Sequence, residues 1–126
     1  MSEVLDIHKK HDYILVGFIG EFNLEAGKRT VDSMIEACFE HDLFAVLLDC
    51  RSMTGNLSIM DRYRLVVYGQ RMLGKVNRVA LVGRQEAVLP DRFAETVAVN
   101  RGINLKVFID MDQAVDWLKA QAFDLQ

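Results

Sequence analysis

One serine stands at a position that suits either a helix cap or a phosphate. Ser58 follows a polar segment, and Asp61 comes three residues later, which is the spacing of a capping motif at a helix N-terminus. A serine hydroxyl in that position accepts a backbone N–H of the first turn, which contributes about 1 kcal/mol. A phosphate on the same hydroxyl would also be stabilised by the positive end of the helix dipole. Ser58 is therefore a predicted cap and a candidate phosphoacceptor.

Asp49 and Cys50 follow an apolar run, 43–48, that is typical of a buried parallel strand. Ligands of α/β proteins bind at the carboxyl ends of such strands, so Asp49 either stabilises the next loop or belongs to a binding site. A nucleophilic cysteine needs a base or a cation that lowers the pKa of its thiol. Arg51 is adjacent to Cys50, but neighbouring residues of a strand face opposite ways. We expect Cys50 to be a packing residue, and no catalytic residue is predicted.

Metal and cofactor chemistry finds little support in the sequence. His8, His11 and Asp12 lie in a predicted edge strand and turn without a fourth ligand at a recognisable spacing. Asp110 and Asp112 supply the cap and the negative first turn that a helix prefers. The glycines form neither of the two common nucleotide-binding motifs. The sequence therefore predicts no metal site and no cofactor.

The segment after Ser58 is both basic and unusually apolar for a surface helix. Two tyrosines alternate with the basic residues, so the region forms either a partner-facing patch or a solvated helix face. The excess of apolar residues favours a second contact surface, which would serve a protein partner or a homodimer. The basic residues are Arg62, Arg64, Arg71, Lys75 and Arg78, and the tyrosines are Tyr63 and Tyr68.

Strands and helices alternate after an opening pair of strands. This order predicts an α/β fold in which parallel strands are joined by right-handed crossovers. Helices are expected from the cap Asn23 to His41, from Ser58 to about Leu73, from Pro90 to Gly102 and after Asp110. Strands are expected at Val4–Lys9, Tyr13–Phe22, Leu43–Leu48, Val76–Val82 and Ile103–Ile109. The predicted buried helix faces are Val31, Met34, Ile35, Cys38 and Phe39, then Phe93, Val97 and Val99, and finally Ala114, Val115, Trp117 and Leu118.

Length and composition restrict the class of protein. The chain has 126 residues, 51% of them hydrophobic and 26% charged, which indicates one folded domain over residues 1–126 rather than disorder. A net charge of −3 argues against nucleic-acid binding as the main role. No apolar run approaches the roughly 18 residues of a membrane span, and the N-terminus lacks the apolar region of a signal peptide. We therefore expect a cytoplasmic protein with both cysteines reduced.

Several stretches resemble the SpoIIAA-like branch of the STAS superfamily, which includes anti-sigma factor antagonists. Phe108–Leu118 is similar to the family ending F-x-D-x-D-x-A-x-x-W-L. The resemblance extends over essentially the whole chain and implies a STAS-like mixed sheet of about five strands, opened by an antiparallel hairpin and packed by four helices. The other similar stretches are Arg101–Ile103, Leu47–Asp49, and the loop from Gly55 to Arg62.

The resemblance also implies a function. In such antagonists a kinase phosphorylates a serine at the position of Ser58, although Leu57, Ile59 and Met60 here depart from the family's D-S-S-G-like motif. The implied role is a non-enzymatic protein-interaction or regulatory module that acts through the loop and helix 52–73. Some relatives are described alongside lipid-binding CRAL-TRIO domains, so the alternative is a carrier or sensor of an apolar or lipid-like ligand between sheet and helices. The candidate partner-binding residues are Asp49, Arg51, Ser52, Thr54, Asn56, Ser58, Arg62, Tyr63 and Arg64.

Overall fold

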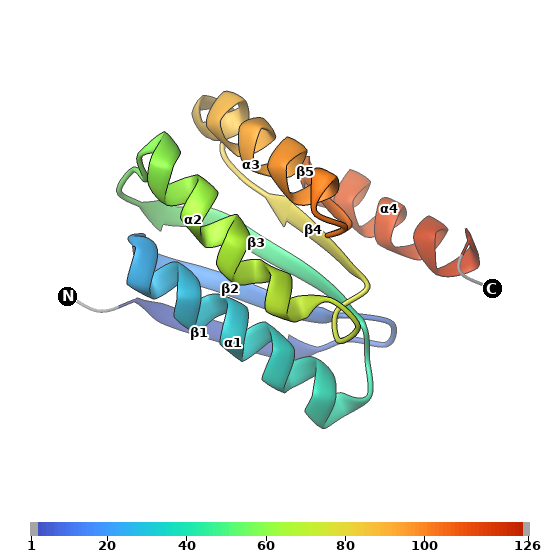
Figure 1. The fold of residues 1–126 in the computed structure, drawn as a ribbon. Helices are drawn as coiled ribbons and strands as arrows, with labels where there is room; N and C mark the ends of the chain where they lie inside the picture. Colours follow the sequence, from blue (N-terminus) through green and yellow to red (C-terminus); the bar gives the residue numbers. More distant parts are fainter. Residues whose placement is uncertain (1–2, 125–126) are drawn as a thin grey trace.

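In the computed structural model, which describes residues 3–124, five strands form one sheet in the order in which they occur along the chain (Figure 1). β1 pairs antiparallel with β2, and β2 to β5 run parallel to one another. The predicted mixed sheet with an antiparallel opening hairpin is therefore confirmed. The strands are β1 (Val4–Lys9), β2 (Ile14–Glu21), β3 (Ala45–Thr54), β4 (Arg78–Val82) and β5 (Leu105–Phe108).

The helices divide unequally between the two faces of the sheet. α1, α2 and α3 each connect two neighbouring parallel strands, and every connection advances in the same direction across the sheet. Right-handed crossovers then place all three helices on one face, whereas α4 follows the last strand and covers the other face. The helices are α1 (Leu24–His41), α2 (Ile59–Gly69), α3 (Val88–Asn100) and α4 (Met111–Asp124), with short 3-10 turns at Gln70–Met72 and Gln85–Ala87.

Each face of the sheet carries its own apolar core. Side chains of alternate strand residues point to opposite faces, so Val46 packs under α1 to α3 while Ala45 and Leu47 pack under α4. On the α4 side, Ala114 and Leu118 are fully buried, as their helical spacing predicts. The larger core, under α1 to α3, surrounds the cavity described below.

The third strand is longer than its apolar run predicts. Residues 52–54 pair with residues 19–21 of β2, and a register shift between Gly17 and Ile19 accommodates one extra residue in β3. The polar residues from Arg51 onward suggest a loop between this strand and Ser58, but that prediction is wrong for residues 51–54, because the polar end of β3 keeps its backbone pairing although Arg51, Ser52 and Thr54 are exposed. Arg51, Ser52 and Thr54 consequently lie on a strand and not in a loop.

Three bulky side chains are more exposed than their helical spacing predicts. Phe39 in the last turns of α1 is 89% exposed, and Phe93 and Val99 of α3 also face solvent. The inward side of α3 instead combines small residues, of which Ala98 is buried, with Val97, which packs against the core. The helix also begins two residues before Pro90, a position that proline tolerates because the first turn needs no intrahelical N–H bond.

Candidate functional site

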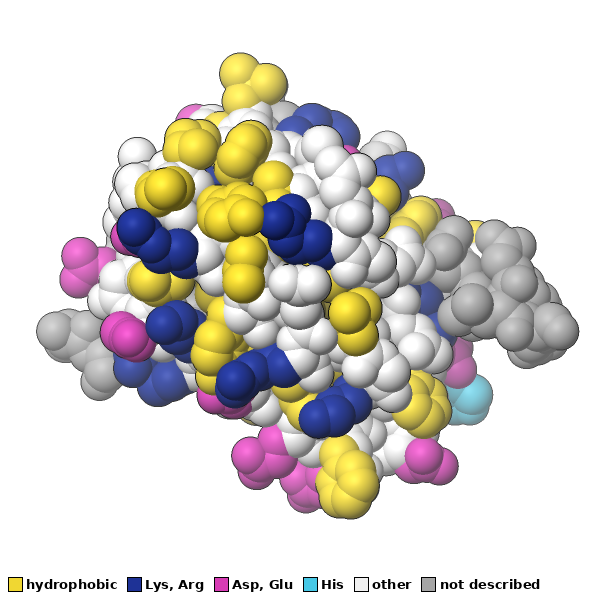
Figure 2. All heavy atoms as spheres, in the orientation of Figure 1, with side chains coloured by type: hydrophobic (Ala, Val, Ile, Leu, Met, Phe, Trp, Pro, Cys, Tyr) yellow, Lys and Arg dark blue, Asp and Glu magenta, His cyan; other side chains and the backbone are white. Residues whose placement is uncertain are grey.

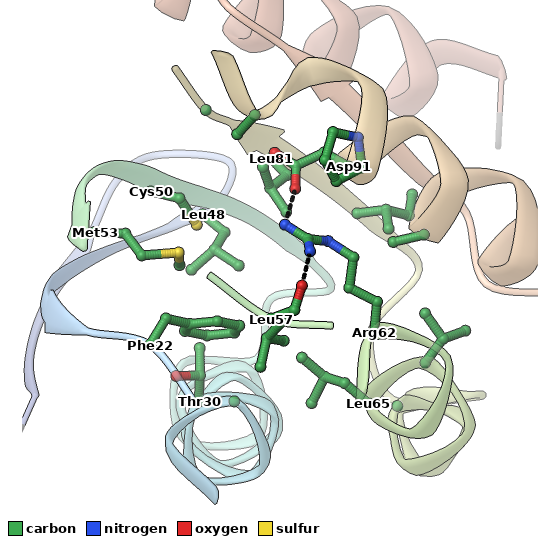
Figure 3. Close-up of a pocket in the computed structure, with 18 of the residues that line it drawn as sticks. Phe22, Thr30, Leu48, Cys50, Met53, Leu57, Arg62, Leu65, Leu81 and Asp91 are labelled. Atoms are coloured by element: carbon green, nitrogen blue, oxygen red, sulfur yellow. Dashed lines mark hydrogen bonds and ion pairs between the residues drawn. The ribbon is translucent and has the colours of Figure 1, made fainter. Parts of the chain in front are cut away.

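A cavity of about 390 Å³ lies between the sheet and the three helices that cover one of its faces (Figure 3). This volume falls within the range of small-molecule binding sites. Side chains from β3, β4 and β5 form the floor, and α1, α2 and α3 supply the walls. The lining is mainly apolar and includes Phe22, Met34, Met53, Leu65, Leu81 and Ile103.

Small residues leave this space unfilled. Ala94 and Ala98 are one helical turn apart on α3, and both line the cavity. Residues at this spacing share one face of a helix, so along this line of α3 only methyl groups border the cavity. Gly69 at the end of α2 contributes no side chain either. The cavity is therefore a consequence of residue size at a few inward positions.

The cavity opens at the carboxyl ends of the parallel strands. Its exposed lining residues are Gly55 and Asn56, after β3, and Arg84 and Glu86, after β4. Ligands of open α/β sheets bind outside the carboxyl ends of the strands, and the mouth lies at this edge. The connections that follow β3 and β4 pass over the same face of the sheet, so no reversal of strand order forms the mouth.

Arg62 and Asp91 place opposite charges in this apolar space (Figure 3). The Arg62 side chain is 13% exposed and the Asp91 side chain 18% exposed, and Arg62 Nη2 lies 3.6 Å from Asp91 Oδ1. Arg62 Nη1 also donates to the backbone carbonyl oxygen of Leu57. Burial raises the pKa of Asp91 above its ordinary range, although the nearby Arg62 acts in the opposite direction. The pair connects α2 to α3 across the cavity.

Cys50 lies on the cavity floor but is poorly suited to nucleophilic chemistry. Burial raises the pKa of its thiol strongly, and the carboxylates of Asp91 and Asp49 raise it further. Burial also raises the pKa of the Cys38 thiol, to about 11. Since the thiolate is the reactive form, both cysteines stay protonated near neutral pH. The interpretation of Cys50 as a packing residue therefore agrees with its environment.

The structure does not bring all nine candidate partner-binding residues together. Only Asn56 and Arg62 line the cavity. Asp49 and Arg51 instead pair with each other, with Arg51 Nε donating to Asp49 Oδ1 at 2.9 Å and Nη2 to Oδ2 at 3.0 Å. This contact lowers the pKa of Asp49. Ser52 and Thr54 lie exposed at the end of β3.

Ser58 is confirmed as the cap of α2. Its Oγ accepts a hydrogen bond of 3.0 Å from the backbone N–H of Asp61, and its side chain is at the surface. Phosphorylation of Ser58 stays a prediction.

Two further candidate residues of α2 have partners within the domain. Arg64, about one turn after Asp61, is exposed and pairs with Asp61 at 2.8 Å. Tyr63 accepts a hydrogen bond of 2.7 Å from Arg101, whose guanidinium stacks over the tyrosine ring.

The predicted basic patch does not form as a single surface. Arg62 points into the cavity, whereas Arg78 is buried and donates to the carbonyl oxygen of Leu118 at 3.2 Å. Arg71 stacks over the Tyr68 ring and reaches Asp32 of α1 at 3.6 Å. The helical and strand geometry thus sends these cations in different directions, and the interpretation as one patch is wrong.

Exposed apolar side chains gather on α2 and the start of α3. In Figure 2 they form a cluster over the upper part of the molecule, where the N-terminal ends of these two helices lie in Figure 1. The most exposed of them, Leu89, is 82% accessible. The apolar excess of α2 is thus partly exposed, and its use as a contact surface stays a prediction. Its members are Ile59, Met60, Tyr63, Val67, Leu89 and Phe93.

Asp91 and the walls contributed by α3 were missed by sequence reasoning. The sequence Pro90-Asp91 is typical of a helix start, and this interpretation concealed the inward direction of the carboxylate. A usable signal was the spacing of Ala94 and Ala98, which marks a small-residue helix face.

Among the described residues, no group of His, Cys, Asp or Glu is arranged to hold a metal ion. Within residues 3–124, no helix has the length and apolar character needed to cross a membrane.

Comparisons with known proteins agree with this architecture. A sequence model described as SpoIIAA-like matches residues 13–119. A solved structure of an uncharacterized protein with a SpoIIAA-like fold, from Shewanella loihica PV-4, is 21% identical with a TM-score of 0.60, over 92% of this chain and 93% of that chain. A solved anti-sigma factor antagonist from Mycobacterium paratuberculosis is 15% identical with a TM-score of 0.64, over 94% of this chain and 95% of that chain. No curated protein gives a significant match.

The two solved structures support the fold alone, because sequence identities of 21% and 15% are too low to indicate a shared function. The family match adds membership, since it includes β2 to β5, the three helices that surround the cavity and most of α4. The chain belongs to the SpoIIAA-like family.

Proposed function

We propose that this domain is a non-catalytic binding module whose site is the cavity beneath α2 and α3. The observation that carries the proposal is an apolar space of about 390 Å³ that opens at the carboxyl ends of β3 and β4. A small molecule with a large apolar part would fill this space and gain free energy from leaving water. The module would act as a carrier or sensor of such a molecule.

The chemistry of the lining supports binding rather than reaction. The Cys50 thiol is buried and has a raised pKa, and Arg62 and Asp91 neutralise each other at 3.6 Å. A catalytic site needs a nucleophile or an acid–base pair tuned near the working pH. The described lining is mainly apolar, with one largely buried charge pair and further polar residues at the mouth, which is the usual composition of a ligand site.

The test is to measure ligand retention when the cavity is filled. Native mass spectrometry and solvent extraction of the purified protein are expected to reveal a bound apolar molecule. Replacing Ala94→Leu inserts a branched side chain into the lining and is expected to lower retention at least tenfold. Val99→Leu, at an exposed position of the same helix, is the control and should retain ligand as the wild type does. Retention that is equal in both variants would overturn the proposal.

A second function is supported by the exposed apolar cluster on α2 and α3. Met60 and Val67 are 57% and 41% exposed, and apolar side chains gathered on a surface frequently mark protein contacts. A regulatory interaction with a protein partner, or a homodimer, would use this face. Light scattering measures the homodimer directly: M60K/V67K should abolish self-association, whereas the control D116K on α4, across the sheet, should not. Unchanged association in M60K/V67K would exclude this face as the dimer seam.

A further inference from the structure

We propose that the ligand of the cavity is an amphiphile with a single anionic headgroup, and that Arg62 binds this headgroup. The inference rests on the proposed function of the cavity and specifies its ligand class. It follows from the position of one largely buried guanidinium in a mainly apolar lining, from the distances to its hydrogen-bond and ion-pair partners, and from the carboxylate that faces it.

Arg62 is positioned to meet a group that enters from the mouth. It lies in the first turn of α2, and its side chain extends from the helix toward α3 (Figure 3). The mouth residues Asn56 and Arg84 line the same cavity. A guanidinium carries five N–H donors in a planar fork that matches a carboxylate or phosphate. An anion placed here would lie at the polar end of the site with its apolar part directed inward.

The present partners of Arg62 leave room for a better acceptor. Nη1 donates to the carbonyl oxygen of Leu57, while Nη2 stands 3.6 Å from Asp91 Oδ1. Charge-assisted N–H···O bonds are shorter, at about 2.7–2.9 Å, and a bidentate carboxylate forms two of them. A ligand carboxylate that is free to adjust its position can therefore approach Arg62 more closely than the side chain of Asp91 does.

Asp91 acts in this arrangement as an internal substitute for the ligand anion. Burial raises the pKa of its carboxyl group, whereas Arg62 and Arg84 both favour the charged form. When a ligand anion takes over Arg62, Asp91 can either accept a proton or remain beside Arg84 at the mouth. The exchange keeps the buried guanidinium paired throughout, which matters because an unpaired buried charge is strongly unfavourable.

The rest of the lining suits an apolar chain of no fixed shape. Met34, Met53 and Met72 come from α1, β3 and the turn after α2. Methionine side chains are unbranched and polarizable, so they adjust to ligands of different outline. The inner end is closed by the branched residues Val79 and Ile103. An anionic head with an alkyl tail fits this division into a charged mouth and an adaptable interior.

The experiment compares chain-matched probes by calorimetry. Decanoate and decanol share the same tail and differ in charge, and the probes are titrated into delipidated protein below their aggregation concentrations. Wild type should bind decanoate at least tenfold more tightly than decanol, as expected for a hydrogen-bonded charge pair in a buried site. R62M should remove this preference and leave decanol affinity within about threefold. R64M, which alters an exposed arginine of the same helix, is the control and should keep the preference.

A second variant keeps the inference testable if R62M does not fold. D91N retains Arg62 and removes the competing carboxylate, so decanoate affinity should rise severalfold while decanol affinity does not. D116N removes a carboxylate from an exposed position of α4, outside the cavity lining, and is its control. Equal binding of decanoate and decanol, or a preference that D91N does not increase, would overturn the headgroup assignment and leave the cavity as an apolar site. Absence of binding by both probes, together with equal retention in Ala94→Leu and Val99→Leu, would instead overturn the proposed function.

Discussion

The guanidinium of Arg62 on α2 lies 3.6 Å from the carboxylate of Asp91 on α3, and both side chains are largely buried. The two residues are 29 positions apart in the chain, but the crossover topology places their helices side by side over the sheet. One charge pair thus links two helices that wall the cavity. Its strength affects the stability of the domain and the chemistry of the cavity together.

The buried carboxyl group of Asp91 should give the stability of the protein a measurable pH dependence. Because its pKa is raised in the folded state, folded Asp91 binds a proton more tightly than unfolded Asp91. Its contribution to the free energy of unfolding is then complete below the unfolded pKa of about 3.9 and is lost as pH rises through the folded pKa. Urea unfolding of wild type and D91N between pH 3 and 7 should show wild type losing stability relative to D91N as pH rises.

Asp49 provides a control of opposite sign for this experiment. Its contact with Arg51 lowers the pKa of its carboxyl group, so its contribution is present above about pH 3.9 and is lost as pH falls. Wild type should therefore gain stability relative to D49N over the same rise in pH. If the stability differences for D91N and D49N change in the same direction, the opposite environments assigned to these carboxylates are wrong.

Loss of the cap should weaken α2 by a predictable amount. The Ser58 hydroxyl accepts the N–H of Asp61 at 3.0 Å, and replacing such a serine with alanine costs about 1 kcal/mol of folding free energy. Ser58→Ala should lower the free energy of unfolding by this amount in urea titrations, and Ser58→Asp should not, because aspartate also caps helices. A Ser58→Ala protein as stable as wild type would contradict the energetic role of the cap.

The fold followed from local signals that agreed with one another. The hairpin, the cap residues Asn23 and Ser58 and the alternation of strands with helices were readable because each depends on neighbours in sequence. The full length of β3 could not be predicted from the sequence, since residues 52–54 lie outside the apolar run and keep their strand conformation through pairing with β2. Tertiary pairing there outweighs the local pattern.

The site was harder to predict than the fold. Arg62 was predicted as a partner-binding residue on an outer patch, whereas its side chain lines the cavity, because helix periodicity gives a face and not the reach of a long side chain. Asp91 could not be found, since its environment depends on the packing of α3 against α2 and β5. The spacing of Ala94 and Ala98 marks a small-residue face of α3, but only the packing of the neighbouring helices and strands shows that this face borders a cavity.

The two thiols should resist modification as long as the protein is folded. Cys38 and Cys50 are buried, and burial raises the pKa of both groups. At pH 8 a soluble disulfide reagent should react at least 100-fold more slowly with native protein than with protein in concentrated urea, because reaction needs an exposed thiolate. Cys50→Ala should retain one slow thiol, and Cys38→Ala the other. Rapid reaction of either single-cysteine variant in native buffer would contradict the burial of its thiol.

Replacing Gly27 with alanine should not raise the free energy of unfolding, although Gly27 lies inside α1. A Cβ there would come within 2.7 Å and 2.9 Å of the two Cδ atoms of Leu65 and 3.0 Å of the Phe22 ring. Leu65 must then move toward the cavity, so crowding offsets the gain of about 1 kcal/mol that alanine normally brings to a helix interior. Gly69 is the matched control, because its nearest contact would be an ordinary 3.4 Å. Urea unfolding should place G69A at or above wild type and G27A about 1 kcal/mol below G69A, and decanol should bind G27A more weakly than wild type. If G27A gains as much stability as G69A and binds decanol normally, α1 and α2 do not pack against the cavity as described.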